Sequence, residues 1–223
     1  MSGLQVDSIR KNFGLRQVLN DIFISCQQGE IIGLLGRNGS GKSTLLKIIF
    51  GTVNAENRFV SIDDIPINSL FENQGLIHYL PQENFLPDHI KIKGVISLFC
   101  SRHQGAILTE NELIRPFLNQ KSSQLSGGER RVVEVLLMVH SEAKYLLFDE
   151  PFNGISPLFI EQIKLIITEH TKTKGFLITD HDYHHILEIS SNIMLLHEGA
   201  IKRIKEVHEL VEWGYLPQAK NRD

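Results

Sequence analysis

The chain has few cysteines, and the two it contains are far apart. Cys26 and Cys100 are its whole complement over 223 residues. Their separation fits neither a metal-binding nor a redox motif. This scarcity argues against a fold stapled by disulfides. We interpret both thiols as small buried side chains.

Long apolar runs are also missing from the sequence. The most apolar stretches, such as residues 132–139, are far shorter than the roughly 18 residues that a membrane span needs. The first residues carry no apolar segment of the kind found in a secretory signal. We therefore expect a cytosolic protein, which would need another chain to cross a membrane.

Charge of one sign is not in excess either. The 23 Lys and Arg residues are opposed by 26 Asp and Glu residues, which gives a formal net charge of −3. Nucleic-acid-binding domains are usually strongly basic, so we expect no nucleic-acid partner, although a local basic patch is compatible with these numbers. With 42% hydrophobic residues and a mass of 25.4 kDa, the chain is long enough for one well-packed domain over residues 1–223.

Strand-like and helix-like patterns alternate along the chain. The almost wholly apolar block at 30–35 predicts a strand covered on both faces, and the block at 42–50 has helical spacing. This alternation predicts an α/β fold with a mainly parallel, covered sheet. Strands are expected at 4–8, 18–25, 30–35, 76–80, 145–148, 176–179, 193–197 and 200–204, a hairpin at 59–67, and helices at 42–50, 92–100, 110–118, 130–140, 157–171, 184–189 and 207–213.

A glycine-rich segment between the strand at 30–35 and the following helix fits the pattern G-x-x-x-x-G-K-[ST]. Glycines let the backbone curl around phosphate groups, and a helix N-terminus adds unpaired N–H groups and a positive dipole end. Lys42 can then bridge the β- and γ-phosphates, and the Ser43 hydroxyl can bind Mg²⁺. A glycine turn that binds nothing does not account for these two residues in the first helical turn. The segment consists of Gly36, Arg37, Asn38, Gly39, Ser40, Gly41, Lys42 and Ser43.

Two acidic residues, Asp149 and Glu150, follow the apolar block at 145–148. Ligands of open α/β sheets bind at the carboxyl ends of the strands. We therefore expect Asp149 to hold Mg²⁺ through water and Glu150 to polarise an attacking water as a general base. Acids after a strand are common, so this prediction depends on their combination with the glycine-rich segment.

A third motif, Leu-Ser-Gly-Gly-Glu at 125–129, precedes the helix expected at 130–140, and here the chain resembles the ATP-binding cassette (ABC) ATPases. The resemblance spans nearly the whole chain, with the motifs in the family's order. It implies a P-loop NTPase core, an N-terminal antiparallel β-subdomain and a short helical subdomain at 83–124. By this resemblance the adenine-stacking aromatic is Phe13, the phosphate (Walker A) loop runs from Gly36 to Thr44, and the Q-loop glutamine is Gln82. The signature contains Ser126, Gly127 and Gly128. The Walker B acid is Asp149, the catalytic glutamate is Glu150, and the switch histidine is His181.

The resemblance also implies how the protein works. In the family, two cassettes pair head to tail, and each ATP lies between the Walker A loop of one chain and the signature of the other. The implied assembly is therefore a homodimer that hydrolyses ATP with Mg²⁺ and docks on an integral membrane permease, in the cytoplasm at the inner face of the membrane. The residues implied are Ser43, Gln82 and Asp149 for the metal, and Glu150, His181, Lys42 and Gln82 for hydrolysis.

Three features of the chain depart from the family pattern. Ser156 stands where the D-loop often has Asp, and position 13 is Phe rather than the commoner Tyr. The segment between Gln82 and Ser126 is short for a helical subdomain that meets a permease. Its apolar residues belong either to the core or to a groove for a helix of that permease, and they are Phe85, Leu86, Ile90, Ile92 and Phe99.

The histidine cluster after the strand at 176–179 has a second interpretation. His181 and His185 have the i, i+4 spacing of zinc-binding histidines, but Asp182 stands where the H-E-x-x-H motif has Glu. The position of His181 directly after a strand favours a γ-phosphate sensor instead.

Three functions fit these motifs. The first is the ATP-hydrolysing subunit of a membrane transporter, which a single cassette without a fused membrane segment favours. The second is a soluble ABC-type ATPase, although such proteins usually carry tandem cassettes, long coiled-coil insertions or zinc modules. The third is a nucleotide-gated clamp with little turnover, which Ser156 favours and an intact Glu150 and His181 disfavour.

Overall fold

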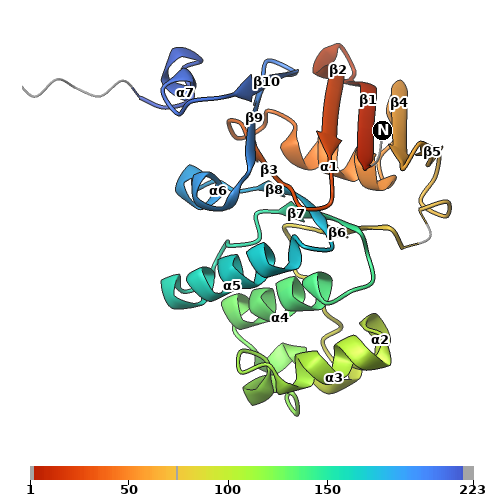
Figure 1. The fold of residues 1–223 in the computed structure, drawn as a ribbon, viewed down its shortest axis with the longest axis vertical. Coiled ribbons are helices and arrows are strands. Elements are labelled where there is room, and N and C mark those ends of the chain that lie inside the picture. The colour runs from red at the N-terminus through yellow and green to blue at the C-terminus, as the bar shows by residue number, and fades with distance from the viewer. Residues whose placement is uncertain (1–2, 74, 218–223) are drawn as a thin grey trace, which may run out of the picture.

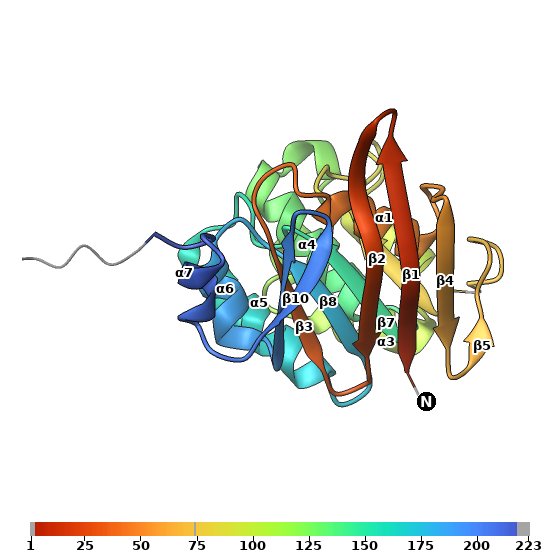
Figure 2. The same cartoon turned by 90° about the horizontal axis from the view of Figure 1, so that it is seen from above.

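Two β-sheets with helix α1 between them form the upper half of the computed structural model, which describes residues 3–73 and 75–217 (Figure 1). The smaller sheet is antiparallel, with strand order β2-β1-β4-β5, and Figure 2 looks down onto it. Apolar and polar side chains alternate along its strands, so one face packs on the core. The strands are β1 (Leu4–Phe13), β2 (Arg16–Cys26), β4 (Asn57–Ile62) and β5 (Ile65–Pro66).

Strand β1 runs five residues beyond the expected 4–8. Ser8 has a positive φ of 53°, and the pairing of β1 with β2 shifts register between Val6 and Ile9. This bulge restores the inward direction at Ile9 after one extra residue. Because the strand continues past the bulge, it carries Phe13 to its far end.

The larger sheet has six strands in the order β10-β9-β3-β8-β7-β6, and all neighbours are parallel except the β9–β10 hairpin. Every residue of β3, β7 and β8 is buried, since both faces of the sheet are covered. The strands are β3 (Ile31–Leu35), β6 (Ile77–Leu80), β7 (Tyr145–Asp149), β8 (Gly175–Thr179), β9 (Asn192–His197) and β10 (Ala200–Ile204).

Alternate residues of this sheet belong to two separate cores. Tyr145 and Leu147 of β7 pack with α1 and the antiparallel sheet, whereas Leu146 and Phe148 pack with α4 and α5 on the other face. Figure 1 shows α4 and α5 side by side beneath the sheet and α2 and α3 further below. The helices are α1 (Lys42–Phe50), α2 (Ile92–Phe99), α3 (Arg102–Glu110), α4 (Gly127–Val139), α5 (Pro157–His170), α6 (Tyr183–Ile189) and α7 (Glu209–Glu212).

The helix expected at 110–118 is wrong. The chain is helical earlier, in α3, which begins after Ser101 because its hydroxyl accepts a hydrogen bond from the Gln104 N–H. Pro116 lacks an N–H and lies in a single 3₁₀ turn, Arg115–Phe117, so the expected helix does not form. The α/β class, the antiparallel β-subdomain and the short helical subdomain are confirmed.

The apolar residues between Gln82 and Ser126 divide between core and surface. Leu86 and Ile92 are buried in the core beside α4, and Phe85 and Ile90 pack against it. Phe99 is 38% exposed. Within residues 3–73 and 75–217, no helix combines the length and the apolar character that crossing a bilayer requires.

Candidate functional site

Four parallel strands deliver the predicted motifs to one edge of the larger sheet. The carboxyl ends of β3, β6, β7 and β8 lie together because these strands are parallel and in order within the sheet. The segments that follow them meet there. These segments are the glycine-rich loop after β3, Gln82 after β6, Asp149 and Glu150 at the end of β7, and His181 after β8.

The glycine-rich loop curls around a cavity and leads into α1. Gly39 and Gly41 have φ values of 76° and 108°, which side-chain-bearing residues rarely adopt. A Cβ at Gly41 would also lie 2.7 Å from Val18 Cγ1. The Lys42 ammonium donates a hydrogen bond to the Gly36 carbonyl at 2.7 Å, and burial lowers the pKa of Lys42 while Glu150, Asp149 and Asp180 oppose that shift.

The cavity has a volume of about 650 Å³ and is lined by most of the predicted residues. Phe13 is 55% exposed, so it is a surface aromatic rather than a core residue, and Lys11 Nζ lies 5.1 Å from its ring centroid. Gly36 and Arg37, also predicted, do not line this cavity. The lining residues are Phe13, Arg16, Val18, Asn38, Gly39, Ser40, Gly41, Lys42, Ser43, Thr44, Gln82, Glu150, Asn153 and His181.

Asp149 is held under the cavity by three hydroxyl groups. Its Oδ1 accepts hydrogen bonds from Ser43 at 3.1 Å and Thr179 at 3.0 Å, and its Oδ2 accepts one from Tyr79 at 3.0 Å. Asp149 is 1% exposed. A hydroxyl and a carboxylate in direct contact supply the hard oxygen ligands that suit Mg²⁺, so the residues present fit this metal.

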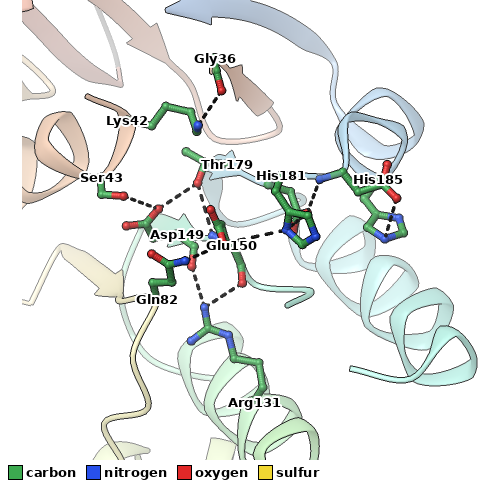
Figure 3. Close-up of polar contacts among 12 residues, drawn as sticks. Gly36, Lys42, Ser43, Gln82, Arg131, Asp149, Glu150, Thr179, His181 and His185 are labelled. Atoms are coloured by element: carbon green, nitrogen blue, oxygen red, sulfur yellow. Dashed lines mark hydrogen bonds and ion pairs between the residues drawn. The ribbon is translucent and has the colours of Figure 1, made fainter. Parts of the chain in front are cut away.

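Glu150 faces the cavity between two side chains from other strands (Figure 3). Gln82 Nε2 donates to Glu150 Oε2 at 2.8 Å, and His181 Nδ1 lies 3.9 Å from the same oxygen. The Glu150 backbone is left-handed, with φ of 53°. A non-glycine residue in this region is strained, and such strain collects at functional sites.

The signature lies outside this cavity. Ser126 caps α4 through a capping box, in which its hydroxyl accepts from the Glu129 N–H at 3.3 Å and Glu129 Oε2 accepts from the Ser126 N–H at 2.7 Å. Gly127 is exposed. A Cβ at Gly128 would lie 2.4 Å from the Gly154 carbonyl oxygen, so this glycine lets α4 approach the loop after Glu150.

The two histidines of the zinc interpretation have different surroundings. His181 is at the cavity, and its Nδ1 lies 3.3 Å from Asp180 Oδ1. His185 does not line the cavity, and its ring packs edge-on against Phe152 at 5.3 Å. Among residues 3–73 and 75–217, no group of three His, Cys, Asp or Glu side chains is arranged to hold a metal.

Sequence reasoning missed Tyr79, Thr179 and Arg131. Thr179 could have been found, because it ends a strand beside the strand that ends at Asp149, and the two residues pair in register. In the sequence, Tyr79 is an ordinary aromatic residue of a strand, and nothing there indicates its contact with Asp149. Burial raises its pKa, and Asp149 adds to that shift. Arg131 reads as a polar position of a helix, although it is 3% exposed.

The chain beyond α7 also reaches the glycine-rich loop. Arg37 Nη2 donates to the Gly214 carbonyl at 2.5 Å. Tyr215 and Gly36 line one hollow together with His181. The helix expected at 207–213 is shorter, and the sequence did not predict this contact between residues 177 positions apart.

Comparison with known proteins gives one consistent result. The sequence model of a family described as ABC transporter matches residues 19–153. The lipopolysaccharide export system ATP-binding protein LptB of Haemophilus influenzae is 32% identical over 215 residues, which cover 90% of this chain and 89% of that protein. The probable sulfate/thiosulfate import ATP-binding protein CysA of Chlorella vulgaris is 29% identical over 217 residues, covering 92% of each.

Solved structures share the fold. A structure described as the ATP binding subunit of an ABC transporter superposes with a TM-score of 0.82 at 22% identity and covers 96% of this chain and 94% of its own. A nucleotide-free ATP-binding cassette from an ABC transporter gives a TM-score of 0.76 at 22% identity and covers 97% of this chain and 96% of its own.

Proposed function

The chain belongs to the ABC transporter family and is an ATPase of that family, and from this premise we propose that it energises a membrane transporter as a head-to-tail homodimer. The observation that carries the proposal is the cavity itself. It brings a phosphate-binding lysine and a metal-binding hydroxyl at the start of α1 together with a carboxylate base that follows β7, and they are Lys42, Ser43 and Glu150.

ATP fits the cavity by its chemistry. The exposed ring of Phe13 at one rim offers a stacking face for adenine. The backbone N–H groups of the glycine-rich loop and the start of α1 favour the phosphates. Lys42 leaves its contact with the Gly36 carbonyl and reaches the β- and γ-phosphates.

The metal site of the proposal consists of oxygen ligands. Ser43 Oγ, the Asp149 carboxylate and the Gln82 side-chain oxygen would hold Mg²⁺, which when bound neutralises charge on the phosphates. Tyr79 and Thr179 orient the Asp149 carboxylate through their hydroxyls.

Glu150 is the general base of the proposed reaction. Its carboxylate accepts a proton from the attacking water, and the contacts from Gln82 and His181 aim it. His181 lies at the same cavity, where it can donate a hydrogen bond to the γ-phosphate. The products are ADP and phosphate.

The signature supports the head-to-tail dimer. Ser126, Gly127 and Gly128 stand at the N-terminus of a 13-residue helix and do not line the cavity of their own chain. A helix N-terminus with small residues suits a phosphate brought by a second copy. Gly128 packs against Gly154, so the loop that leads to Ser156 would follow movement of the signature.

The membrane partner of the proposal would dock on the helical subdomain. Leu98 of α2 is 71% exposed, and Phe99 of α2 and Ile107 of α3 are further exposed apolar side chains of this subdomain. Docking on a permease would place the protein in the cytoplasm, peripheral to the inner face of the membrane. Because the relatives are named for lipopolysaccharide export and for sulfate or thiosulfate import, the cassette alone does not set the cargo.

The proposal is tested by purifying the tagged chain from its native membranes. We expect Mg²⁺-dependent ATP hydrolysis and co-purification of a multi-span membrane protein. Leu98→Glu should abolish that co-purification, while the matched control Leu165→Glu, at a leucine 66% exposed on α5, should retain it. ATP hydrolysis without any membrane partner would favour the soluble ATPase, and failure to bind ATP would remove all three functions.

A further inference from the structure

A buried arginine on α4, the helix that follows the signature, donates hydrogen bonds to the backbone at Asp149 and Glu150 (Figure 3). Arg131 is 3% exposed, and its Nη2 donates to the carbonyl of Asp149 at 2.6 Å and to that of Glu150 at 2.9 Å. Both carbonyls belong to the turn that ends β7. Arg131 therefore contacts the main chain of the two residues whose side chains face the metal site and the attacking water.

The other amino group of Arg131 extends this contact to the segment before Gln82. Arg131 Nη1 donates to the Pro81 carbonyl at 2.6 Å and to Glu134 Oε2 at 3.3 Å. One guanidinium thus joins the turn after β6 to the turn after β7. Gln82 follows the Pro81 carbonyl, and Glu150 follows the Asp149 carbonyl. On the cavity side, the side chains of Gln82 and Glu150 are hydrogen-bonded to each other.

Glu134 continues the network toward the helical subdomain. It is fully buried, and its Oε1 accepts hydrogen bonds from the Phe85 N–H at 2.8 Å and the Leu86 N–H at 3.4 Å. A buried carboxylate with these partners is fixed in place. The chain after Gln82 is therefore tied, through Glu134 and Arg131, to the backbone of Glu150.

Packing alone does not account for an arginine at this position. Removing a guanidinium from water is costly unless its donors are satisfied. Both amino groups of Arg131 are used, while its Nε is buried without a hydrogen-bond partner in the described part of the chain. An apolar side chain would fill the space without that cost. It could not, however, hold the carbonyl of a residue whose φ is 53°.

We propose that Arg131 is a positioning residue that holds the left-handed backbone of Glu150 and so orients the Glu150 carboxylate. Glu134 links these hydrogen bonds of Arg131 to the backbone amides of Phe85 and Leu86. The inference rests on the proposed role of Glu150 as the base. It predicts that movement of the segment after Gln82 changes hydrolysis through the main chain of Glu150, in addition to the side-chain contact with Gln82.

The first test measures kcat and ATP affinity separately in Arg131 variants. Arg131→Gln cannot reach the Asp149, Glu150 and Pro81 carbonyls together, so kcat should fall about 10- to 100-fold, while the Kd for ATP changes less than about twofold. Arg131→Lys keeps a cation that can reach one carbonyl and should restore part of kcat. Arg130→Gln, at the neighbouring arginine that pairs with Asp88, is the matched control and should keep kcat within about twofold.

The second test combines Arg131→Gln with Glu150→Gln. If Arg131 acts through the Glu150 carboxylate, the double variant should be no slower than Glu150→Gln alone. A residue that merely supports the fold would lower the turnover of both backgrounds by the same factor. If Arg131→Gln does not fold by circular dichroism, Arg131→Lys is measured in both backgrounds instead.

The outcomes separate this inference from the proposed function. A folded Arg131→Gln variant with kcat within about twofold of the wild type would overturn the inference, as would equal fold-losses in the two backgrounds. Full turnover in Glu150→Gln alone would instead overturn the assignment of the base. Reduced kcat at unchanged ATP affinity, with no further loss in the double variant, supports both.

Discussion

The side chain of Gln82 donates a hydrogen bond to Glu150 at 2.8 Å, although the two residues are 68 positions apart in the sequence. Gln82 follows β6 and begins the segment that leads into the helical subdomain, whereas Glu150 ends β7. The pairing of β6 with β7 brings both to the same edge of the sheet. This contact makes the proposed base sensitive to the subdomain that would meet a membrane partner.

Phe13→Ala should weaken binding of ADP and ATP by the same factor, because the ring would stack on the base and not on the γ-phosphate. Loss of base stacking typically costs about 1–3 kcal/mol, or roughly 5- to 150-fold in Kd. Equilibrium binding of fluorescent nucleotides measures both constants. Phe23→Ala is the matched control, since Phe23 is 43% exposed on β2 and does not line the cavity. Unchanged affinity in Phe13→Ala would make Phe13 an ordinary surface residue.

A mixture of two inactive variants should regain ATPase activity. Lys42→Ala removes the phosphate contact and Ser126→Arg blocks the signature, so a heterodimer of the two contains one intact site and one doubly defective site. Random pairing with independent sites should return about one quarter of wild-type activity. Each variant measured alone is the control. Light scattering of Glu150→Gln with ATP checks the assembly, and a monomer there would contradict the head-to-tail dimer.

Tyr79→Phe should raise the Mg²⁺ concentration needed for hydrolysis. The change removes the hydroxyl that donates to Asp149 Oδ2 at 3.0 Å and leaves the ring, which lies 5.7 Å from that of Phe50, in place. Loss of a group that orients a metal ligand typically weakens metal binding about 10- to 100-fold. A Mg²⁺ titration of ATPase activity measures the shift. An unchanged titration would show that Asp149 needs no help from Tyr79.

The free energy of unfolding should fall as the pH is lowered from 7 toward 4, because His140 takes up a proton more readily in the unfolded chain than in the folded one. Burial, with His170 and Lys174 nearby, lowers the pKa of His140 from 6.5 to about 4. The unfolded chain therefore binds a proton below pH 6.5 that the folded chain excludes until about pH 4. The free energy of unfolding should drop by about 2 kcal/mol between pH 7 and pH 5 from this group.

Urea denaturation at several pH values measures that slope. His140→Gln removes the titration, so its slope between pH 7 and pH 5 should be flatter than that of the wild type. His103→Gln, at an exposed histidine of α3, is the matched control and should keep the wild-type slope. Equal slopes for the wild type and His140→Gln would contradict the buried, neutral state of His140.

Much of this architecture was predictable because its signals are local. The apolar blocks that became β3, β7 and β8 have no polar position at which to face water, and Lys42 and Ser43 follow their glycines in a fixed spacing. The parallel strands that these motifs follow place them at one edge of the sheet, where ligands of open α/β sheets bind. Phe13 and Gln82, which only the family resemblance implied, also line the cavity.

The rest depends on contacts between distant residues, which spacing does not reveal. The bulge at Ser8 extends β1 by a register shift that its alternation hides. The helix near 110 was placed too late because the cap at Ser101 and the break at Pro116 outweigh weak periodicity. The sequence does not single out Arg131, because its three carbonyl partners come from two segments that are distant in the sequence.

The turnover of Glu150→Gln tests the central claim most directly. The carboxamide has nearly the size of the carboxylate but cannot take the proton of the attacking water, so single-turnover hydrolysis should slow about 10²- to 10⁴-fold while the Kd for ATP stays within about twofold. Glu169→Gln, at an exposed glutamate of α5, is the control and should hydrolyse ATP at the wild-type rate. Near-normal hydrolysis by folded Glu150→Gln would contradict the account, because the cavity would then contain a base other than Glu150.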